Sequence, residues 1–339
     1  MLRIRANPFV RCFIAFALAA ANLMAASLSH AGEERLAGSI AFGDREDVVA
    51  FITEMVDRHG FRAHELKNLF GRARYQPSVV SAMAPTPTGQ RDWSLYRARF
   101  LNVRRIENGI RFWSQYRAPL ERAAARFGVP EEIIVAIIGV ETEYGRQMGT
   151  YRVMDALSTL AFDYPRRAGY FRSELEHYLL HTREARIDPL SMRGSFAGAL
   201  GIPQFMPGSY RRFAIDFDGD GRRDLIGSSV DAIGSVANFL VEHGWVRELP
   251  IAYPATVQGD AHAVMLYAGI LPAFRAAELG EYGVTTVGRL ADDATVALVE
   301  LETPGQLSTF WVGTTNFYTI TRYNQSSFYA ISVIELANA

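Results

Sequence analysis

Glu141 is the residue whose type and position in this chain most clearly indicate chemistry. It ends the apolar run 133–141, IIVAIIGVE. At helical spacing, Glu141 shares a face with Ile134, Ile137 and Ile138. Apolar surroundings disfavour an ionised carboxylate and raise its pKa, so the group can hold a proton near neutral pH and then donate it. Glu141 is therefore a candidate general acid.

The residues around this run predict the helix that would carry the acid. Pro130 suits the first position, Glu131 and Glu132 complement the positive end, and Gly145 suits a left-handed stop. A glutamate at a helix end can also reach water or pair with a nearby cation, here Arg146, without any catalytic role. Both interpretations stay open on this segment alone.

Two further segments place polar side chains where they could bind a ligand. Segment 162–167, FDYPRR, puts paired arginines after a turn, where they could bind carboxylates or cap the preceding helix. Segment 194–207, GSFAGALGIPQFMP, combines small residues with the hydrogen-bonding groups of Ser195 and Gln204. The same small residues would also suit a tight helix crossing.

A fourth segment, 316–329, reads NFYTITRYNQSSFY. Its aromatic rings and amide donors are suited to stacking and orienting sugar rings. By itself, an aromatic stripe is more often part of a hydrophobic core.

Together with the segment around the acid, 139–145, which reads GVETEYG, these three segments in this order and at these separations resemble the lytic murein transglycosylase B family, whose members cleave the glycan strands of peptidoglycan. The resemblance runs from about residue 45 to the C-terminus. It implies a mainly α (α+β) fold, with a lysozyme-like core, an N-terminal helical domain and a small β-rich inserted domain. It also implies that Glu141 is the sole catalytic carboxylate. The substrate-binding residues that it implies are Arg166 and Arg167 for peptide or sugar substituents, Ser195 and Gln204 for sugar groups near the acid, and Tyr323, Asn324 and Tyr329 along the same cleft.

One position departs from the family pattern. Phe239 follows Val-Ala-Asn238, where the resembling family carries a cleft tyrosine. Phenylalanine keeps the stacking face but has no hydroxyl to form a hydrogen bond.

The family mechanism uses one carboxylate twice. Glu141 would protonate the glycosidic oxygen and then, as an anion, accept the proton of the muramic acid 6-hydroxyl as it closes on the anomeric carbon. The product is a 1,6-anhydro sugar, and intramolecular attack needs no carboxylate to activate water. One alternative is a hydrolytic muramidase with Asp163 as second carboxylate. Another is a noncatalytic peptidoglycan-binding protein, which would have no use for a carboxylate on an isoleucine face.

The acidic segment that begins at Asp216 resembles a calcium-binding loop. Asp216, Asp218, Asp220 and Asp224 hold loop positions 1, 3, 5 and 9, with Gly221 at position 6 and Arg222 at position 7, whose backbone carbonyl would be a ligand. Position 12 is Gly227, so the usual glutamate is missing and either Asp231 or Asp224 would close the site. We expect a structural Ca²⁺ and no cofactor for catalysis. The simpler alternative is a solvated acidic turn.

Residues 1–31 have the form of a secretory signal peptide. Arginines precede an apolar stretch, and Ser29-His-Ala31 has the small-x-small form of a cleavage site. No lipid-attachment pattern surrounds Cys12, so we expect a periplasmic protein without a lipid anchor. An uncleaved membrane anchor is the alternative, although the stretch is shorter than the roughly 20 residues of a spanning helix. Cleavage would remove the only cysteine and with it any disulfide or thiolate chemistry.

The whole chain has the composition of a globular protein, with 49% hydrophobic residues, 21% charged residues and a formal net charge of −1. This charge balance does not favour a nucleic-acid binder. We expect a monomer that acts on glycan strands and works beside other cell-wall enzymes. The expected divisions are a helical domain (32–128), the catalytic core with the acidic loop (129–245), a β-rich insertion (246–308) and a C-terminal segment that completes the core (309–339), with a helix from Tyr323 onward.

Overall fold

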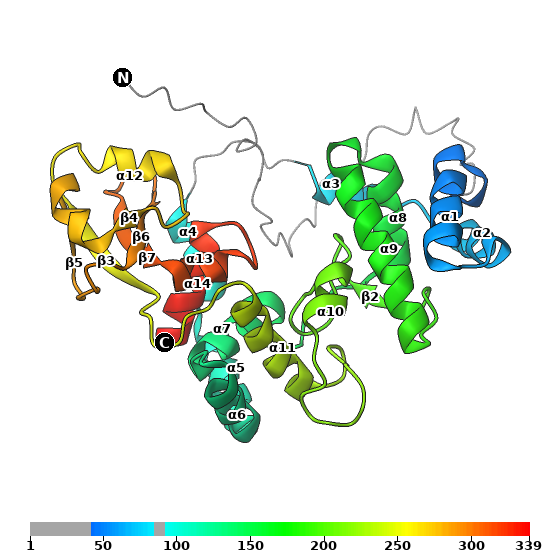
Figure 1. The fold of residues 1–339 in the computed structure, drawn as a ribbon, viewed down its shortest axis with the longest axis horizontal. Coiled ribbons are helices and arrows are strands. Elements are labelled where there is room, and N and C mark those ends of the chain that lie inside the picture. Colours follow the sequence, from blue (N-terminus) through cyan, green and yellow to red (C-terminus); the bar gives the residue numbers. More distant parts are fainter. Residues whose placement is uncertain (1–41, 85–91) are drawn as a thin grey trace.

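The computed structural model describes residues 42–84 and 92–339 of the chain. The expected signal peptide, 1–31, and most of the expected loop 84–90 lie outside these ranges. The described chain is mainly helical and carries one small antiparallel sheet at one end (Figure 1). Its α-helices are α1 (Glu46–His59), α2 (Ala63–Arg72), α3 (Pro77–Ala82), α4 (Trp93–Phe100), α5 (Val103–Gln115), α6 (Arg117–Phe127), α7 (Glu131–Thr142), α8 (Val153–Asp163), α9 (Ala168–Ala185), α10 (Pro207–Phe213), α11 (Ser229–Glu242), α12 (Ala263–Ala268), α13 (Thr315–Thr321) and α14 (Ser327–Asn338).

Helix α7 lies at the centre of the large hydrophobic core. All of its residues from Ile133 to Thr142 are buried, because α5, α6, α11 and α14 pack around it. A helix that is apolar on all sides is stable only when it is surrounded in this way. The isoleucine face expected around Glu141 is thus one part of a fully enclosed helix.

The N-terminal helices pack against two different parts of the molecule. Helix α3 packs against α8, whereas α4 packs against α14 and α5 and α6 pack against α7. Arg45, just before α1, forms an ion pair with Asp163 at the end of α8, with 2.8 Å between the nitrogen and oxygen. One continuous hydrophobic core runs from Phe42 to Leu336. The expected boundary at residue 128 therefore does not separate two hydrophobic cores.

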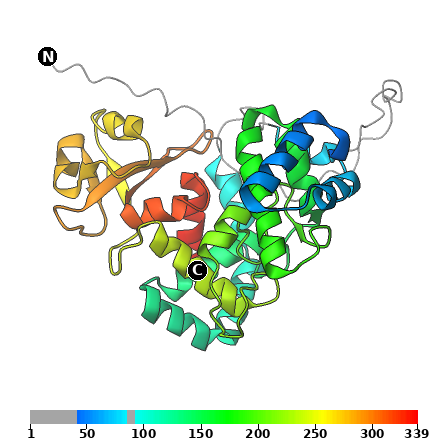
Figure 2. The ribbon, with the colours of Figure 1, turned by 45° about the vertical axis from the view of Figure 1, so that its right-hand side comes forward.

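The β-rich part is a five-stranded antiparallel sheet at the opposite end from α1 and α2, and the turned view keeps this separation (Figure 2). The strand order is β4-β6-β7-β3-β5, and Met265, Leu298 and Val312 belong to its separate apolar cluster. The sheet includes β7, so it runs six residues past the expected limit at 308. The bounds are β3 (Ala252–Val257), β4 (Phe274–Arg275), β5 (Val284–Thr286), β6 (Thr295–Leu301) and β7 (Thr309–Thr314), while β1 (Tyr151–Arg152) and β2 (Arg193–Gly194) form a separate pair. Short 3₁₀ turns are η2 (Phe42–Asp44), η3 (Pro165–Arg167) and η4 (Ala276–Tyr282).

The chain returns from the sheet through α13 and α14, which lie between the sheet and α7 (Figure 1). The helix expected from Tyr323 onward begins later, at Ser327, because Ser326 caps it by accepting a hydrogen bond from the backbone N–H of Tyr329. Tyr323 consequently lies in the turn between the two helices. Among the described residues, no helix is both long enough and apolar enough to span a lipid bilayer.

Candidate active site

Glu141 lies at the end of α7 in a backbone that turns sharply. Glu141 is only 9% exposed to solvent. The helix ends at Thr142, and the next three residues, Glu143, Tyr144 and Gly145, have positive φ angles of 49°, 62° and 82°. The left-handed stop predicted at Gly145 therefore begins two residues earlier. Non-glycine residues adopt this conformation only when their surroundings stabilise it.

Polar contacts from α5 and from Gln147 hold this turn. The carboxylate of Glu143 accepts hydrogen bonds from Asn108 Nδ2 (3.0 Å) and Gln147 Nε2 (3.1 Å) and pairs with Arg104 Nε (2.8 Å). Arg146, the cation considered as a partner for Glu141, instead has its nearest guanidinium nitrogen 4.0 Å from Glu143. The carboxylate of Glu143 therefore stabilises the turn through these contacts.

The hydroxyl of Tyr144 fits between two glycines. A Cβ atom at Gly109 or at Gly139 would lie 2.5 Å from this oxygen, which is too close for either position to carry a side chain. The Tyr144 ring therefore occupies the space that side chains at both glycines would take, and this fit helps to fix the strained turn.

Glu141 has one direct polar partner in the described structure. Tyr329 donates a hydrogen bond from its hydroxyl to Glu141 Oε1 at 2.6 Å. Burial raises the pKa of Glu141 to about 7, although the hydrogen bond from Tyr329 acts in the opposite direction. The carboxyl can therefore be protonated near neutral pH, as a general acid requires.

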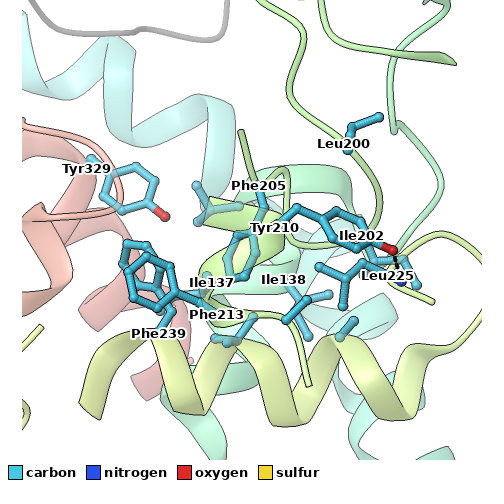
Figure 3. Packing of buried hydrophobic residues seen from close by; sticks show 14 of the residues in the cluster. Ile137, Ile138, Leu200, Ile202, Phe205, Tyr210, Phe213, Leu225, Phe239 and Tyr329 are labelled. Atoms are coloured by element: carbon cyan, nitrogen blue, oxygen red, sulfur yellow. Dashed lines mark hydrogen bonds between the residues drawn. The ribbon is translucent and has the colours of Figure 1, made fainter. Parts of the chain in front are cut away.

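A second tyrosine stacks beside the first. The rings of Tyr323 and Tyr329 are 6.5 Å apart and nearly parallel, at 17°. Tyr323 also lies 4.5 Å from Phe239 and 5.8 Å from Phe205, centroid to centroid. Figure 3 shows Tyr329, Phe205 and Phe239 gathered near Ile137 of α7. Burial and the nearby charge of Glu141 raise the pKa of both tyrosines well above the usual value, so both hydroxyls remain protonated donors.

The hydrogen bond from Tyr329 predicts a measurable change in pH dependence. Activity should fall as the pH rises through the pKa of Glu141, because the acid form starts the reaction. Tyr329→Phe removes a donor that stabilises the carboxylate, so the alkaline limb should move up by about one pH unit. The check is the pH profile of kcat for the two proteins. A limb that stays in place or moves down would contradict this role for Tyr329.

Phe239 fills its place with apolar contacts. Its ring stacks on His243, with centroids 3.9 Å apart and an interplanar angle of 27°, and it lies 5.2 Å from Phe213. The position therefore contributes an aromatic face without a hydroxyl, as the sequence indicates.

Gln204 belongs to a tight turn that lies close to Tyr323. It has a φ of +52°, and its side-chain amide donates to the carbonyls of Gly201 (2.9 Å) and Met148 (3.2 Å). Met148 and Gly201 line a hollow of about 400 Å³ together with Met192. Phe205, the next residue, packs against Tyr323, which places this turn beside the tyrosine pair.

The other predicted binding residues lie on separate elements. Ser195 caps a turn by accepting the backbone N–H of Ala199 at 3.0 Å. Arg166 is exposed in η3, and the guanidinium of Arg167 lies over the ring of Tyr170 at 4.3 Å. Asn324 follows Tyr323 in the turn before α14. Their part in binding a substrate stays a prediction.

Asp163 does not resemble a second catalytic carboxylate. Its Oδ1 is 2.8 Å from Arg45 Nη1, and the same guanidinium group pairs with Asp47. An ion pair of this kind stabilises the end of α8 against α1 and leaves no visible role in acid–base chemistry.

The acidic loop, residues 216–231, brings together part of the predicted ligand set. Carboxylate oxygens of Asp216, Asp218 and Asp231 all lie within 4.8 Å of one another. Asp224 is turned away from this cluster and accepts the backbone N–H groups of residues 226 and 227 at 2.9 and 2.8 Å. Asp220 accepts the N–H of Arg222 at 2.8 Å and is also outside the cluster. Of the two alternatives for closing the loop, the geometry favours Asp231.

The side chain of Asp231 also binds the backbone of the acidic loop. It is fully buried, and its carboxylate accepts N–H groups of Phe217 (2.7 Å), Asp218 (3.2 Å) and Asp224 (2.8 Å). These hydrogen bonds fix the backbone of the loop beside the carboxylate cluster, where a cation would bind.

Comparison with known proteins decides the family. Residues 43–338 match the family model described as the transglycosylase SLT domain. The membrane-bound lytic murein transglycosylase B of Escherichia coli K12 is 43% identical over 307 residues, which cover 88% of this chain and 83% of that protein. This chain belongs to the lytic murein transglycosylase B family. It is a lytic transglycosylase, a lyase that cleaves peptidoglycan.

Solved structures of relatives agree with this membership. The catenated lytic transglycosylase SltB1 of Pseudomonas aeruginosa has a TM-score of 0.83 and 43% identity, and the match covers 88% of this chain and 97% of that one. The E. coli lytic transglycosylase Slt35, solved in complex with calcium, has a TM-score of 0.78 and 42% identity, with coverage of 88% and 93%. The expected mainly α fold with a lysozyme-like core is therefore confirmed.

Sequence reasoning missed the residues that hold the turn after the acid. Thr142 donates to a carbonyl 60 positions away, and Asn108 reaches Glu143 from another helix. These contacts join segments that are distant in the sequence. The only local signal was the pair of polar residues, Thr142 and Glu143, directly after the apolar run, which is an unfavourable place for them unless they have partners.

Proposed function

We propose that Glu141 is the single catalytic acid and base of this lytic transglycosylase, acting on the glycan strands of peptidoglycan. The observation that carries this proposal is a buried carboxyl with a pKa of about 7 that receives a hydrogen bond from Tyr329. The alternative second carboxylate, Asp163, is occupied by Arg45. One carboxyl must then serve both halves of the reaction.

In the first half, Glu141 donates its proton to the glycosidic oxygen between MurNAc and GlcNAc as the carbon–oxygen bond breaks. In the second half, the resulting carboxylate accepts the proton of the MurNAc 6-hydroxyl while the 6-oxygen bonds to the anomeric carbon. The leaving sugar keeps the first proton, and Glu141 returns to its acid form. Tyr329 stabilises the anionic form between the two halves through its hydrogen bond.

The product of purified glycan strands tests the reaction class. We expect every new MurNAc end to have the mass of a 1,6-anhydro sugar, which is one water less than the hydrolysed end. Chromatography with mass detection of digested sacculi measures this directly. Ends that carry an added water would show a hydrolytic muramidase, and an absence of new ends would favour a binding protein.

For substrate binding, we propose that Tyr323, Asn324, Ser195 and Gln204 contact sugar groups. The packing of Phe205, the residue after Gln204, against Tyr323 supports a shared binding region for the Gln204 turn and the segment of Tyr323 and Asn324. Arg166 is exposed and is suited to the acidic groups of peptide or sugar substituents.

For the acidic loop, we propose a structural Ca²⁺ bound by Asp216, Asp218 and Asp231, with a backbone carbonyl from Arg222. The three clustered carboxylates and the oxygen-only donor set fit this ion, which takes six to eight oxygen ligands. Bound calcium would neutralise the mutual repulsion of the carboxylates. We propose no part for this ion in the bond-breaking steps themselves, because the carboxyl of Glu141 supplies the acid and the base for both.

For the location and assembly of the enzyme, the proposal rests on the sequence. The charged and apolar pattern of residues 1–31 supports export to the periplasm, where peptidoglycan strands are the partner. We propose an enzyme without a lipid anchor that acts as a monomer alongside other cell-wall enzymes.

A further inference from the structure

Thr142, the residue after Glu141, joins the end of α7 to a distant segment. Its hydroxyl donates to the carbonyl of Ile202 at 2.8 Å and accepts the backbone N–H of Gly145 at 2.9 Å. The residue is 1% exposed. One hydroxyl therefore ties both sides of the left-handed turn that directly follows the acid.

Ile202 continues the connection to the acidic loop. Its backbone N–H donates to the carbonyl of Leu225 at 2.8 Å, and a Cβ at Gly201 would lie 2.4 Å from that carbonyl oxygen. The two backbones are thus pressed together. Figure 3 shows Ile202 and Leu225 side by side, close to Ile138 of α7.

Leu225 lies at the base of the acidic loop. The preceding residue, Asp224, donates its N–H to Asp231 Oδ2 at 2.8 Å, and the N–H of Leu225 donates to the hydroxyl of Tyr210 at 3.0 Å. A continuous path of hydrogen bonds and adjacent residues therefore runs from Asp231 through Leu225, Ile202 and Thr142 to the acid.

We propose that Thr142 is a positioning residue through which the acidic loop sets the place of Glu141. This inference rests on the proposed function of Glu141 and goes beyond it, because it gives the loop a part in activity in addition to stability. When the loop is ordered, the carbonyl of Leu225 has a fixed position and accepts the backbone N–H of Ile202. Ile202 in turn fixes the hydroxyl that braces the turn, and a small displacement of a catalytic group is costly.

Substitution of Thr142 by valine or by serine distinguishes the effect of the hydroxyl from the effect of the side-chain shape. Thr142→Val keeps the branched shape and removes both hydrogen bonds, whereas Thr142→Ser keeps the hydroxyl and removes a methyl group. On soluble glycan strands, we expect Thr142→Val to lower kcat about ten-fold, less than the roughly hundred-fold cost of a displacement of about 1 Å. KM should stay within about two-fold of the wild-type value, and Thr142→Ser should restore kcat to within about three-fold. A purely structural role would lower thermal stability without this split between kcat and KM.

Hydrogen exchange of the wild-type protein tests the path without any substitution. We expect a calcium chelator to speed exchange at the Ile202 and Gly145 amides, because their acceptors depend on the order of the loop. In Thr142→Val the Gly145 amide should exchange fast at the outset and should not respond to the chelator. In Thr142→Ser the response should return.

The outcomes are distinct from those for the proposed function. If Glu141→Gln is inactive while Thr142→Val has the wild-type kcat, the positioning role is overturned and the role of Glu141 stands. If the chelator opens the loop amides of Phe217 and Asp224 but leaves Gly145 unchanged, the connection to the loop is overturned. Retained activity in Glu141→Gln would instead overturn the proposed function itself.

Discussion

Replacing Glu141 by glutamine should lower activity on purified sacculi by at least about a thousand-fold, near the upper end of what one acid–base group contributes. Glutamine keeps the size of the side chain but has no acidic proton to transfer to the glycosidic oxygen. It also cannot accept the proton of the 6-hydroxyl, so both halves of the reaction lose their group. The release of soluble 1,6-anhydro products over time measures the loss.

A matched control lies on the same helix. Glu132 is partly exposed in the first turn of α7, and Glu132→Gln should keep activity within about two-fold. Near-normal turnover by Glu141→Gln, or an equal loss in both variants, would contradict a specific role for Glu141.

The pH dependence of the free energy of unfolding is a second, independent test of Glu141→Gln, and the direction of the change is defined. The pKa of Glu141 is about 7 in the folded protein, against an ordinary value of 4.5. The folded state therefore holds an extra proton between these values, and the stabilisation from the neutral group is lost as the pH rises through 7. Glutamine has no buried charge to desolvate, so the free energy of unfolding of the variant, relative to wild type, should rise from pH 5 to pH 8.

Asp231→Asn should cause the largest loss of stability among the loop substitutions. Asp231 is fully buried and accepts three backbone N–H groups, and asparagine loses both the charge and one of the two acceptor oxygens. We expect a loss of about 3 kcal/mol in the free energy of unfolding, or roughly 5–10 °C in Tm. Thermal unfolding in the presence of a chelator measures this loss without any contribution from calcium.

The same substitution tests the calcium site. Calcium at a hundred times its Kd should stabilise the wild-type protein by about 2.7 kcal/mol, and this increase should be absent in Asp231→Asn. Asp220→Asn is the control, because Asp220 lies outside the carboxylate cluster. We expect it to keep the Tm in chelator and most of the response to calcium. An equal response to calcium in wild type and Asp231→Asn would remove Asp231 from the site.

Local patterns in the sequence were sufficient for the elements that are stabilised by local interactions. The apolar run before Glu141 corresponds to α7, and the β-rich segment expected at 246–308 contains β3 and β6. Helix starts and the acidic loop also have local signatures. The raised pKa of Glu141 was expected from the same pattern, because the carboxyl shares a helix face with three isoleucines.

Tertiary contacts set the features that the sequence did not reveal. The early left-handed turn at Glu143 is stabilised by Asn108 from another helix, so spacing around Gly145 alone could not place it. The start of α14 depends on the cap at Ser326, which aligns Tyr329 with the acid. Likewise, the position of β7 in the sheet depends on pairing with β3 and β6.

The titration of the Glu141 side chain tests the central claim most directly. Carbon-13 NMR of the labelled carboxyl group in the mature enzyme, with Glu141→Gln to assign the signal, reports its protonation at each pH. The structure predicts a midpoint near 7, and a higher one in Tyr329→Phe. A midpoint near the ordinary value of 4.5 would show that the group is ionised at neutral pH, and it would contradict Glu141 as the acid that starts the reaction.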